Sequence, residues 1–462
     1  MTTQKKIGAT KSAPKNRAAA ISLARKAAFN ILLSVEGGQS HSDDLLRSRA
    51  VDALAEPDRN LATALVLGVL RWQIVLDRQV RELLERPNAK LDPEILIALR
   101  MGAFQILQMD RIPARAAIDE SVELAKQAGH RFASGMVNAV LRKLANSRQP
   151  RVSVNYEAHP AWMVARWISF YGPEAAQAIC RHGQSHPALI VHLASPVVEA
   201  EVGESGIALE PGEMLTAART VVSGDVAATQ AFREGRVRFQ DEGSQLVAEF
   251  ARASPNQEAR SILDVCAAPG GKTLILAERN PHAKIVACEF SVPRLEQLRK
   301  RLSFLGDRVE CRLADATTLP DHATFDLVLA DVPCSGTGTL GRNPEIRHRL
   351  RPEDLDRQAE RQRAILSAAL RAVRPGGNVI YSTCSLELEE NEQVVASVLA
   401  ANPDVRVVSL EARIGELRAD GVLFQLGAER LSRSLTPEGY LRLLPGVFST
   451  DGFFVALLER TA

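Results

Sequence analysis

The chain of 462 residues is long enough for two or three domains, and with 46% hydrophobic residues it can bury a large core. It has no uninterrupted apolar run of about 18 residues, which argues against a conventional membrane-spanning helix. The six cysteines all stand more than four residues apart, a pattern typical neither of a zinc site nor of a small disulfide scaffold. We therefore expect a cytoplasmic protein with free thiols and no metal.

The charge is unevenly spread along the chain. The net charge is +2, but residues 1–148 carry 23 Lys and Arg against 15 Asp and Glu, a balance of +8 that leaves −6 for the rest. This asymmetry indicates an anionic partner for the first third, with solvated helix faces as the alternative. Seven basic and no acidic residues in the first 35, without an apolar segment, exclude a secretory signal. We predict a basic disordered tail at 1–16; an organelle transit peptide is the compositional alternative.

Residues 17–147 read as one all-helical domain. The stretch "LATALVLGVLRWQIVLDRQVRELLE" (61–85) repeats apolar residues at steps of three and four, and two later segments do the same. Residues 148–186 predict a linker followed by short helices. Residues 187–240 mix short strands, such as "LIVHLA" and "GRVRFQ", with turns, which indicates a small α+β module.

Residues 241–462 change to strands that alternate with helices. Buried-strand runs such as "SILDVCAA", "KIVACEF", "FDLVLAD" and "GNVIYSTCS" are separated by helical segments. Such alternation predicts an α/β fold, a doubly wound sheet with parallel strands. Ligands of such a sheet bind at the carboxyl ends of the strands, near the point where the strand order reverses.

The loop "LDVCAAPGGKT" (263–273) joins the first of these strands to a helix and is rich in small residues. Glycines there let backbone amides approach a ligand, and a helix N-terminus favours an anionic group. The spacing matches neither a Walker loop nor G-x-G-x-x-G. Glu289 ends the next strand, where an acid grips a ribose diol, and Asp315 ends the third, where it could accept a hydrogen bond from an adenine amino group. Together these strand ends predict a nucleoside cofactor site.

Two cysteines, each followed by serine, come directly after two further strands: Cys334 in "ADVPCSGTG" and Cys384 in "IYSTCSLELEEN". The strands that end at 331 and 383 should be neighbours, so both thiols and Asp331 should converge over the cofactor. Carbon 5 of a pyrimidine takes a methyl group only after a thiolate has added at carbon 6. One thiol as nucleophile, an aspartate at the pyrimidine edge and a second thiol that assists release would meet these needs. Lys272 could lower the pKa of the attacking thiol.

The motifs together resemble the Sun-type RNA cytosine-5 methyltransferases. The chain contains, in that family's order, "FQDEGSQLVA" (239–248), "DVCAAPGGKT", "DVPCSGTGTLGRNPEIR", "LRAVRPGGNVIYSTCS" and "LEENE" (388–392). The closing "DGFFVALLER" (451–460) resembles the last strand of the family. Residues 17–147 resemble the NusB-type RNA-binding domain that precedes the catalytic part in the bacterial ribosomal RNA subgroup.

The resemblance implies a Rossmann-like methyltransferase domain that binds S-adenosylmethionine. The implied cofactor residues are Cys266, Ala267, Ala268, Pro269, Gly270, Gly271, Lys272, Glu289, Arg294, Asp315 and Asp331. Cys384 would be the nucleophile, Cys334 would help to break the enzyme–RNA adduct, and Asp331 would complete the catalytic set. The implied substrate is an unstacked cytosine of small-subunit ribosomal RNA, gripped by the helical domain and the 187–240 module of a monomeric enzyme.

The chain departs from the family pattern at two positions and in the stretch 193–210, which is shorter than the usual segment of the small module. Val332 stands where alanine is usual, which should tighten the wall of the pocket, and Glu289 stands where aspartate is commoner. Three alternatives stay open at this point: the same chemistry on transfer RNA, a non-catalytic RNA-binding assembly factor, and a small-molecule or protein methyltransferase. The last of these has no need of two cysteines at strand ends.

Overall fold

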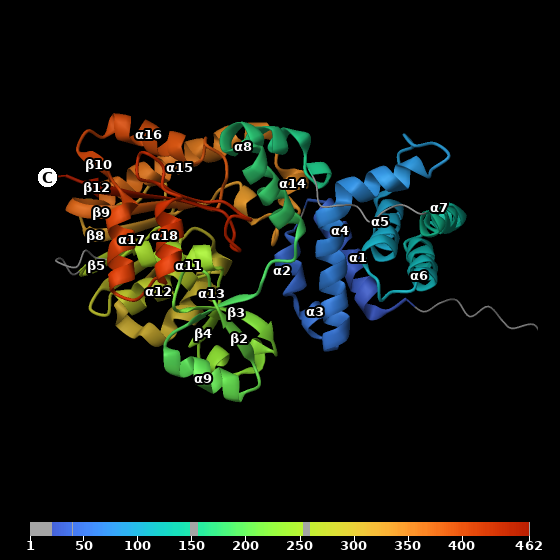
Figure 1. The fold of residues 1–462 in the computed structure, drawn as a ribbon, viewed down its shortest axis with the longest axis horizontal. Coiled ribbons are helices and arrows are strands. Elements are labelled where there is room, and N and C mark those ends of the chain that lie inside the picture. Colours follow the sequence, from blue (N-terminus) through green and yellow to red (C-terminus); the bar gives the residue numbers. More distant parts are fainter. Residues whose placement is uncertain (1–20, 39, 148–155, 253–258, 462) are drawn as a thin grey trace, which may run out of the picture. The chain divides into compact units, whose positions relative to one another are not determined.

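The computed structural model describes residues 21–38, 40–147, 156–252 and 259–461 (Figure 1). The chain divides into two compact units, residues 1–153 and 154–462. The predicted tail at 1–16 lies outside the described residues, as do residues 148–155 of the predicted linker.

The regular elements of the first unit are all helical over its described part. Its α-helices are α1 (Leu23–Glu36), α2 (Ser42–Leu46), α3 (Arg49–Asp52), α4 (Glu56–Glu82), α5 (Pro93–Gln108), α6 (Ala114–Gln127) and α7 (Ser134–Asn146). α4 buries an apolar stripe with the period of a helix, including Leu65, Val69 and Leu76. By length and hydropathy α4 is the one described helix that could cross a membrane. However, 56% of its most apolar 18-residue stretch is buried inside the structure, which is typical of a core helix.

The second unit is built on a large mixed sheet. Its strands are β5 (Ser261–Asp264), β6 (Lys284–Glu289), β7 (Val309–Leu313), β8 (Phe325–Asp331), β9 (Val373–Thr383), β10 (Val405–Val408), β11 (Leu441–Leu443) and β12 (Phe453–Arg460). The order is β10-β12-β9-β8-β5-β6-β7, with β11 paired to β12. β5 to β9 pair in parallel, whereas β12 runs antiparallel to β9. The order reverses at β5, whose neighbours are β6 and β8, as expected for a doubly wound sheet.

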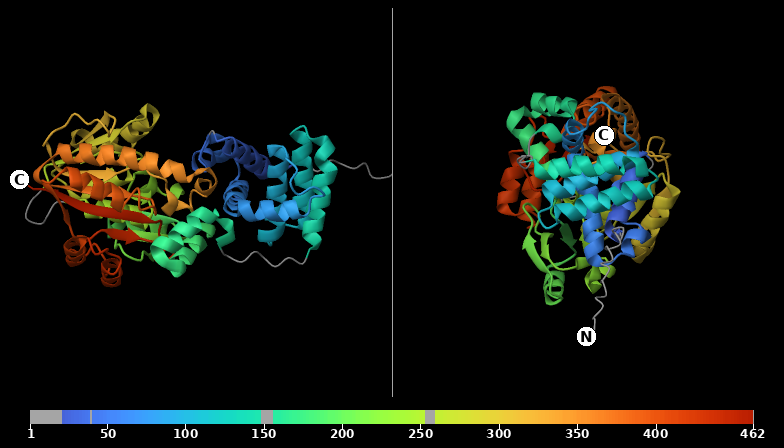
Figure 2. Two further views of the ribbon diagram at one scale, coloured as in Figure 1. Left: turned by 90° about the horizontal axis from the view of Figure 1, so that it is seen from above. Right: turned by 90° about the vertical axis from the view of Figure 1, so that its right-hand side faces the viewer.

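Helices cover both faces of this sheet. The helices are α11 (Glu242–Phe250), α12 (Gly271–Arg279), α13 (Val292–Leu302), α14 (Ile346–Arg349), α15 (Pro352–Ala372), α16 (Glu392–Ala401), α17 (Leu410–Ala419) and α18 (Gln425–Ser432). Successive strand residues point to opposite faces. Leu327 and Leu329 therefore join the core with α11, α12, α17 and α18, while Val328 and Ala330 join the core with α15 and α16. Figures 1 and 2 show α15 and α16 on one side of the sheet and α17 and α18 on the other.

A smaller sheet and a kinked helix complete the second unit. The remaining elements are α8 (Ala161–Gln184), β1 (Ile190–Leu193), α9 (Pro196–Glu204), β2 (Ala208–Pro211), β3 (Ala218–Ser223), α10 (Gln230–Arg233) and β4 (Val237–Phe239). The four strands form an antiparallel sheet in the order β2-β3-β1-β4. α8 kinks at Gly172, just before Pro173, because proline cannot continue the hydrogen bonds of a helix.

A glycine contact between α4 and α5 makes a prediction for the helical unit. A Cβ at Gly68 would lie 2.0 Å from Cζ of Phe104. Gly68→Ala should therefore lower the free energy of unfolding by about 1–3 kcal/mol, the usual cost of overpacking. Gly135→Ala, on the exposed face of α7 with no atom within 4 Å of the added Cβ, should be neutral or stabilising by up to about 1 kcal/mol. Urea unfolding followed by circular dichroism measures both, and equal effects would contradict the close packing.

Candidate active site

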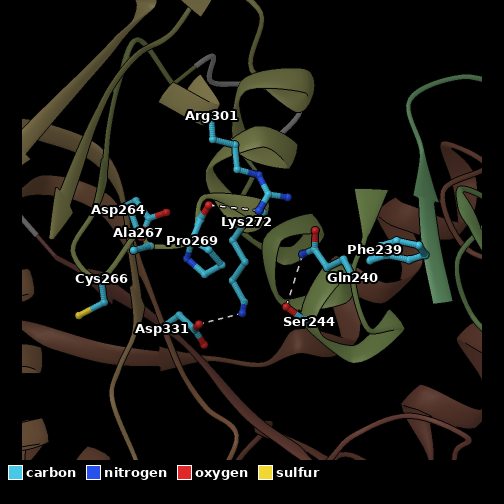
Figure 3. A pocket seen from close by; sticks show the side chains of 12 residues that line it. Phe239, Gln240, Ser244, Asp264, Cys266, Ala267, Pro269, Lys272, Arg301 and Asp331 are labelled. Atoms are coloured by element: carbon cyan, nitrogen blue, oxygen red, sulfur yellow. Dashed lines mark hydrogen bonds and ion pairs between the residues drawn. The ribbon is translucent and has the colours of Figure 1, made fainter. Parts of the chain in front are cut away.

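The carboxyl ends of β5 to β9, with the loops and helix starts that follow them, carry the predicted site residues, and a pocket opens beside the loop after β5 (Figure 3). Seven of its lining residues were predicted from the sequence: Cys266, Ala267, Ala268, Pro269, Gly271, Lys272 and Asp331. The sequence reasoning missed five others: Phe239, Gln240, Ser244, Asp264 and Arg301. Three of these, Phe239, Gln240 and Ser244, lie in the "FQDEGSQLVA" motif, which was the available signal although it assigned them no role.

Two glycines shape the first loop: Gly270 allows its turn, and Gly271 lines the pocket. Gly270 has a φ of +99°, a conformation that favours glycine, and a Cβ there would lie 2.9 Å from Leu298. A Cβ at Gly271, the first residue of α12, would lie 2.9 Å from Oε1 of Gln240. That oxygen is buried and has no hydrogen-bond partner among the described residues. The loop thus presents an open backbone and an unused acceptor to the pocket.

Asp264, the last residue of β5, is buried beneath this loop. Its Oδ2 accepts a hydrogen bond of 2.7 Å from Oγ1 of Thr273 in α12. Burial raises the pKa of Asp264 to about 6, although the Thr273 hydroxyl acts in the opposite direction. The residue therefore titrates well above the usual range of an aspartate.

Glu289, the predicted ribose acid, is the last residue of β6 and is not among the residues that line the pocket. It is 7% exposed, and its Oε1 accepts a hydrogen bond of 2.8 Å from the amide of Ser291. Arg294 stands 3.7 Å from its Oε2 and also donates to the carbonyl of Ala268. The structure thus brings Glu289, Arg294 and the first loop together.

Asp315, by contrast, is turned toward its own chain. It lies two residues beyond β7, is exposed, and accepts hydrogen bonds from the amide and hydroxyl of Thr317. The Thr317 amide lowers the pKa of Asp315. Like Gly270, Glu289 and Arg294, it is not among the residues that line the pocket.

Lys272 links the pocket to β8, the strand that leads to Cys334. Its Nζ lies 2.8 Å from Oδ2 of Asp331 (Figure 3). The same Nζ lies 5.4 Å from the ring centre of Phe453. Burial acts to lower the pKa of Lys272, but the adjacent Asp331 carboxylate outweighs it, so the pKa is raised and the ammonium persists. Asp331 also accepts a hydrogen bond of 2.7 Å from the Ser382 hydroxyl on the neighbouring strand.

Cys334 and Cys384 meet, as predicted from the two strand ends. β8 and β9 pair in parallel with Asp331 opposite Ser382, and the two Sγ atoms are 3.2 Å apart. Both cysteines are partly exposed, although Ser335 and Ser385 next to them are buried. The hydrogen bond with Cys384 raises the pKa of Cys334 well above its ordinary value, which favours the thiol form of Cys334.

The third thiol near the pocket differs from this pair. Burial raises the pKa of Cys266, and the charges of Asp264 and Asp331 raise it further. Because the thiolate is the reactive form, Cys266 is suited to lining the pocket rather than to attack.

Comparisons with known proteins identify the family. Residues 252–459 match the family model of the 16S rRNA methyltransferases RsmB/F, and residues 22–146 match that of the NusB family. A probable ribosomal RNA small subunit methyltransferase B of Bacillus subtilis is 31% identical over 468 residues, which cover 94% of this chain and 98% of that protein. The ribosomal RNA small subunit methyltransferase B of Pseudomonas putida is 32% identical over 407 residues, with 85% and 92% covered.

The chain belongs to the RsmB/F family of methyltransferases. The resemblance to a Sun-type enzyme with an N-terminal NusB-like domain is thereby confirmed, as is the fold class. The crystal structure of PH0851 superposes with a TM-score of 0.75 at 24% identity and covers 96% of this chain and 100% of that one. That of NSun6 from Pyrococcus horikoshii with SFG gives 0.55 at 18% identity, with 67% and 100% covered. At these identities the two structures support the fold alone.

The raised pKa of Asp264 predicts a pH-dependent stability. The folded state binds the proton more tightly than the unfolded chain, whose reference pKa is 3.8, so stability falls as the pH rises from about 4 to about 6. Asp264→Asn removes this loss. The free energy of unfolding of Asp264→Asn, measured relative to that of the wild type, should therefore rise by about 2–3 kcal/mol as the pH increases from 3.5 to 7. Urea titrations across this range measure the difference; a wild type that gains on the variant as the pH rises would contradict the assignment.

Proposed function

We propose that the protein transfers a methyl group from S-adenosylmethionine to carbon 5 of a cytosine in small-subunit ribosomal RNA, with Cys384 as the nucleophile. The observation that carries the proposal is the pair of partly exposed thiols, 3.2 Å apart, at the ends of two adjacent strands. Methylation of a hydroxyl or an amino group needs no thiol, whereas carbon 5 requires a nucleophile at carbon 6. Membership of the RsmB/F family supports small-subunit ribosomal RNA as the substrate.

The pocket suits S-adenosylmethionine, which would supply an electrophilic methyl group on a sulfonium. Gly271 leaves room for close approach, and Gln240 offers a buried acceptor without a partner among the described residues. The Glu289 carboxylate would hold the two ribose hydroxyls, with Arg294 fixing its direction. Asp315 would serve the adenine end once its side chain turns away from Thr317.

The thiols would act in turn on the base. The Cys384 thiol would lose its proton to solvent, and the thiolate would add to carbon 6. The electron pair of the carbon 5–carbon 6 double bond would then make carbon 5 nucleophilic, with negative charge shared by nitrogen 3. The Lys272 ammonium, paired with the Asp331 carboxylate, would donate the hydrogen bond that stabilises the charge at nitrogen 3. The carbon 5 electron pair would then form a bond to the methyl group while the methyl–sulfur bond of the sulfonium breaks and leaves a neutral thioether. The carbon 5 proton would leave to water, the double bond re-form and the carbon 6–sulfur bond break. The protonated Cys334 would donate a hydrogen bond to the departing Cys384 thiolate.

RNA binding would fall to the parts outside the catalytic sheet. The NusB-family match covers residues 22–146, and most of the +8 charge of residues 1–148 comes from the basic residues that precede this match. The small sheet of β1 to β4 contributes Phe239 to the wall of the pocket, which supports a role near the target base. Attack at carbon 6 requires the cytosine to leave its stack. A ribosomal RNA substrate is consistent with work in the cytoplasm.

The two thiol roles predict opposite results for two substitutions. Cys384→Ala should abolish methylation and form no covalent RNA complex, because the attacking sulfur is gone. Cys334→Ala should accumulate a covalent complex while turnover falls by about 100-fold or more, because release is impaired. Denaturing gel electrophoresis with unmodified small-subunit ribosomal RNA and S-adenosylmethionine detects the complex. Cys311→Ser, on β7, is the control and should behave as the wild type; a complex with Cys384→Ala but none with Cys334→Ala would reverse the roles.

The assignment of Glu289 to the ribose predicts a binding defect. Glu289→Gln keeps an acceptor for the Ser291 amide but loses the charge, so S-adenosylmethionine should bind about 10- to 100-fold more weakly, the cost of a hydrogen bond to a charged group. Isothermal titration calorimetry measures this without RNA. Glu296→Gln, an exposed position on α13, is the matched control. An unchanged affinity for Glu289→Gln, or an equal loss in both variants, would sink the assignment.

A further inference from the structure

The acidic run that follows Cys384, "SLELEEN" (385–391), sends its side chains in two directions. Glu387 and Glu389 pair with Arg166 of α8 at 2.8 and 2.5 Å. Trp167 of α8 also donates to Glu387. Glu390 is fully buried, and its carboxylate takes no part in these contacts with α8. Its role is therefore separate from the attachment of the run to α8.

The Glu390 carboxylate lies where the two cysteine loops meet. Its Oε1 accepts hydrogen bonds from the Ser335 amide at 2.8 Å and from Nε2 of Gln362 at 2.9 Å. Its Oε2 accepts hydrogen bonds from the hydroxyls of both Ser335 and Ser385, which are themselves 3.0 Å apart. One buried acceptor thus joins the residue after Cys334 to the residue after Cys384. This explains why each cysteine is followed by serine.

The loop of Cys334 depends on Glu390 on both sides. Ser335, which follows Cys334, bonds to Glu390 with both its amide and its hydroxyl. Pro333, which precedes it, accepts a hydrogen bond of 2.9 Å from Gln362, the same amide group that donates to Glu390. Loss of Glu390 would therefore release Ser335 and remove one of the two acceptors that orient the Gln362 amide beside Pro333.

The loop of Cys384 has additional supports. The carbonyl of Cys384 accepts a hydrogen bond of 2.9 Å from the Gly338 amide. Asn391 bonds to the hydroxyl of Thr383 and to the carbonyl of Ser385. Cys384 should therefore keep its place when Glu390 is shortened, whereas Cys334 should not.

We infer that Glu390 is a positioning residue that holds the Cys334 thiol against Cys384, through Ser335 and Gln362, and thereby enables release of the methylated RNA. The release step rests on the proposed function, but the positioning of the two thiols does not. The negative charge of Glu390 adds to the Cys384 hydrogen bond and to burial in raising the pKa of Cys334. The Glu390 carboxylate therefore both positions the Cys334 thiol and favours its protonated form.

The first test measures thiol proximity and needs neither RNA nor cofactor. Diamide, which takes two hydrogens from a pair of thiols, oxidises Cys334 and Cys384 to a disulfide that peptide mass spectrometry quantifies. Glu390→Asp keeps the charge but is one methylene shorter, so the disulfide should form about 10-fold more slowly than in the wild type. Glu389→Asp, the same change one residue earlier, should leave the rate within about 2-fold. Alkylation of each thiol by N-ethylmaleimide corrects for changes in exposure.

A second variant keeps this test decisive if Glu390→Asp fails to fold. Ser335→Ala removes one of the two bonds between Glu390 and the residue after Cys334 and leaves Glu390 its other donors. Disulfide formation should slow in this variant as well, by a smaller factor. If Glu390→Asp folds and forms the disulfide at the wild-type rate, the inference is overturned. If Glu390→Asp does not fold, a wild-type rate in Ser335→Ala overturns it.

The second test measures release. With small-subunit ribosomal RNA and S-adenosylmethionine, Glu390→Asp should accumulate the covalent complex seen with Cys334→Ala, and Glu389→Asp should not. A complex in Cys334→Ala but none in Glu390→Asp would overturn the link between positioning and release. No complex in either variant, together with slow disulfide formation in Glu390→Asp, would overturn the proposed function and leave Glu390 as the residue that positions the thiols.

Discussion

The parallel pairing of β8 with β9 is the constraint on which the site depends. With Asp331 opposite Ser382, the two strands end at the same edge of the sheet, and two cysteines 50 residues apart in sequence come into contact. The loops can cross only because Gly338 has no side chain: a Cβ there would lie 2.5 Å from the carbonyl of Gly452 and 2.8 Å from that of Cys384. The "SGTG" sequence is therefore a packing requirement of the thiol pair.

The reversal of strand order at β5 supplies the second half of the site. It leaves the loop before α12 beside the end of β8, so that Lys272 reaches Asp331 across the gap between them. A buried cation is stable here because it is paired with a carboxylate, which in turn bonds to Ser382 of β9. One chain of contacts thus runs from the cofactor pocket to the strand that carries the nucleophile.

Much of this arrangement could be predicted from the sequence, because the strands are strongly patterned and site residues follow them directly. The meeting of Cys334 and Cys384 needed only the identification of two adjacent parallel strands. Val332, where the family usually has alanine, is buried and its amide simply continues the ladder to Ser382. The direction of a side chain in a loop carries no such pattern, and Asp315 accordingly bonds to its own turn.

Contacts between residues far apart in the sequence were even harder to predict from the sequence. Arg166 of α8 pairs with Glu387, 221 residues away, and nothing in either local sequence indicates the partner. The role of Glu390 was also out of reach, because three glutamates within four residues look alike until the fold turns one of them inward. The serine after each cysteine was the only indication in the sequence. Its role is clear from the structure, in which both serine hydroxyls donate to the Glu390 carboxylate.

The central claim is that Cys384 bonds covalently to carbon 6 of a cytosine while carbon 5 is methylated. The most direct measurement uses small-subunit ribosomal RNA in which 5-fluorocytidine replaces cytidine, because fluorine at carbon 5 leaves no proton to remove and blocks release. After incubation of the wild-type protein with S-adenosylmethionine and digestion, mass spectrometry should find a methylated fluorocytosine nucleotide on the peptide that contains Cys384. The same nucleotide on the Cys334 peptide, or no adduct from a preparation that methylates ordinary RNA, would contradict the account.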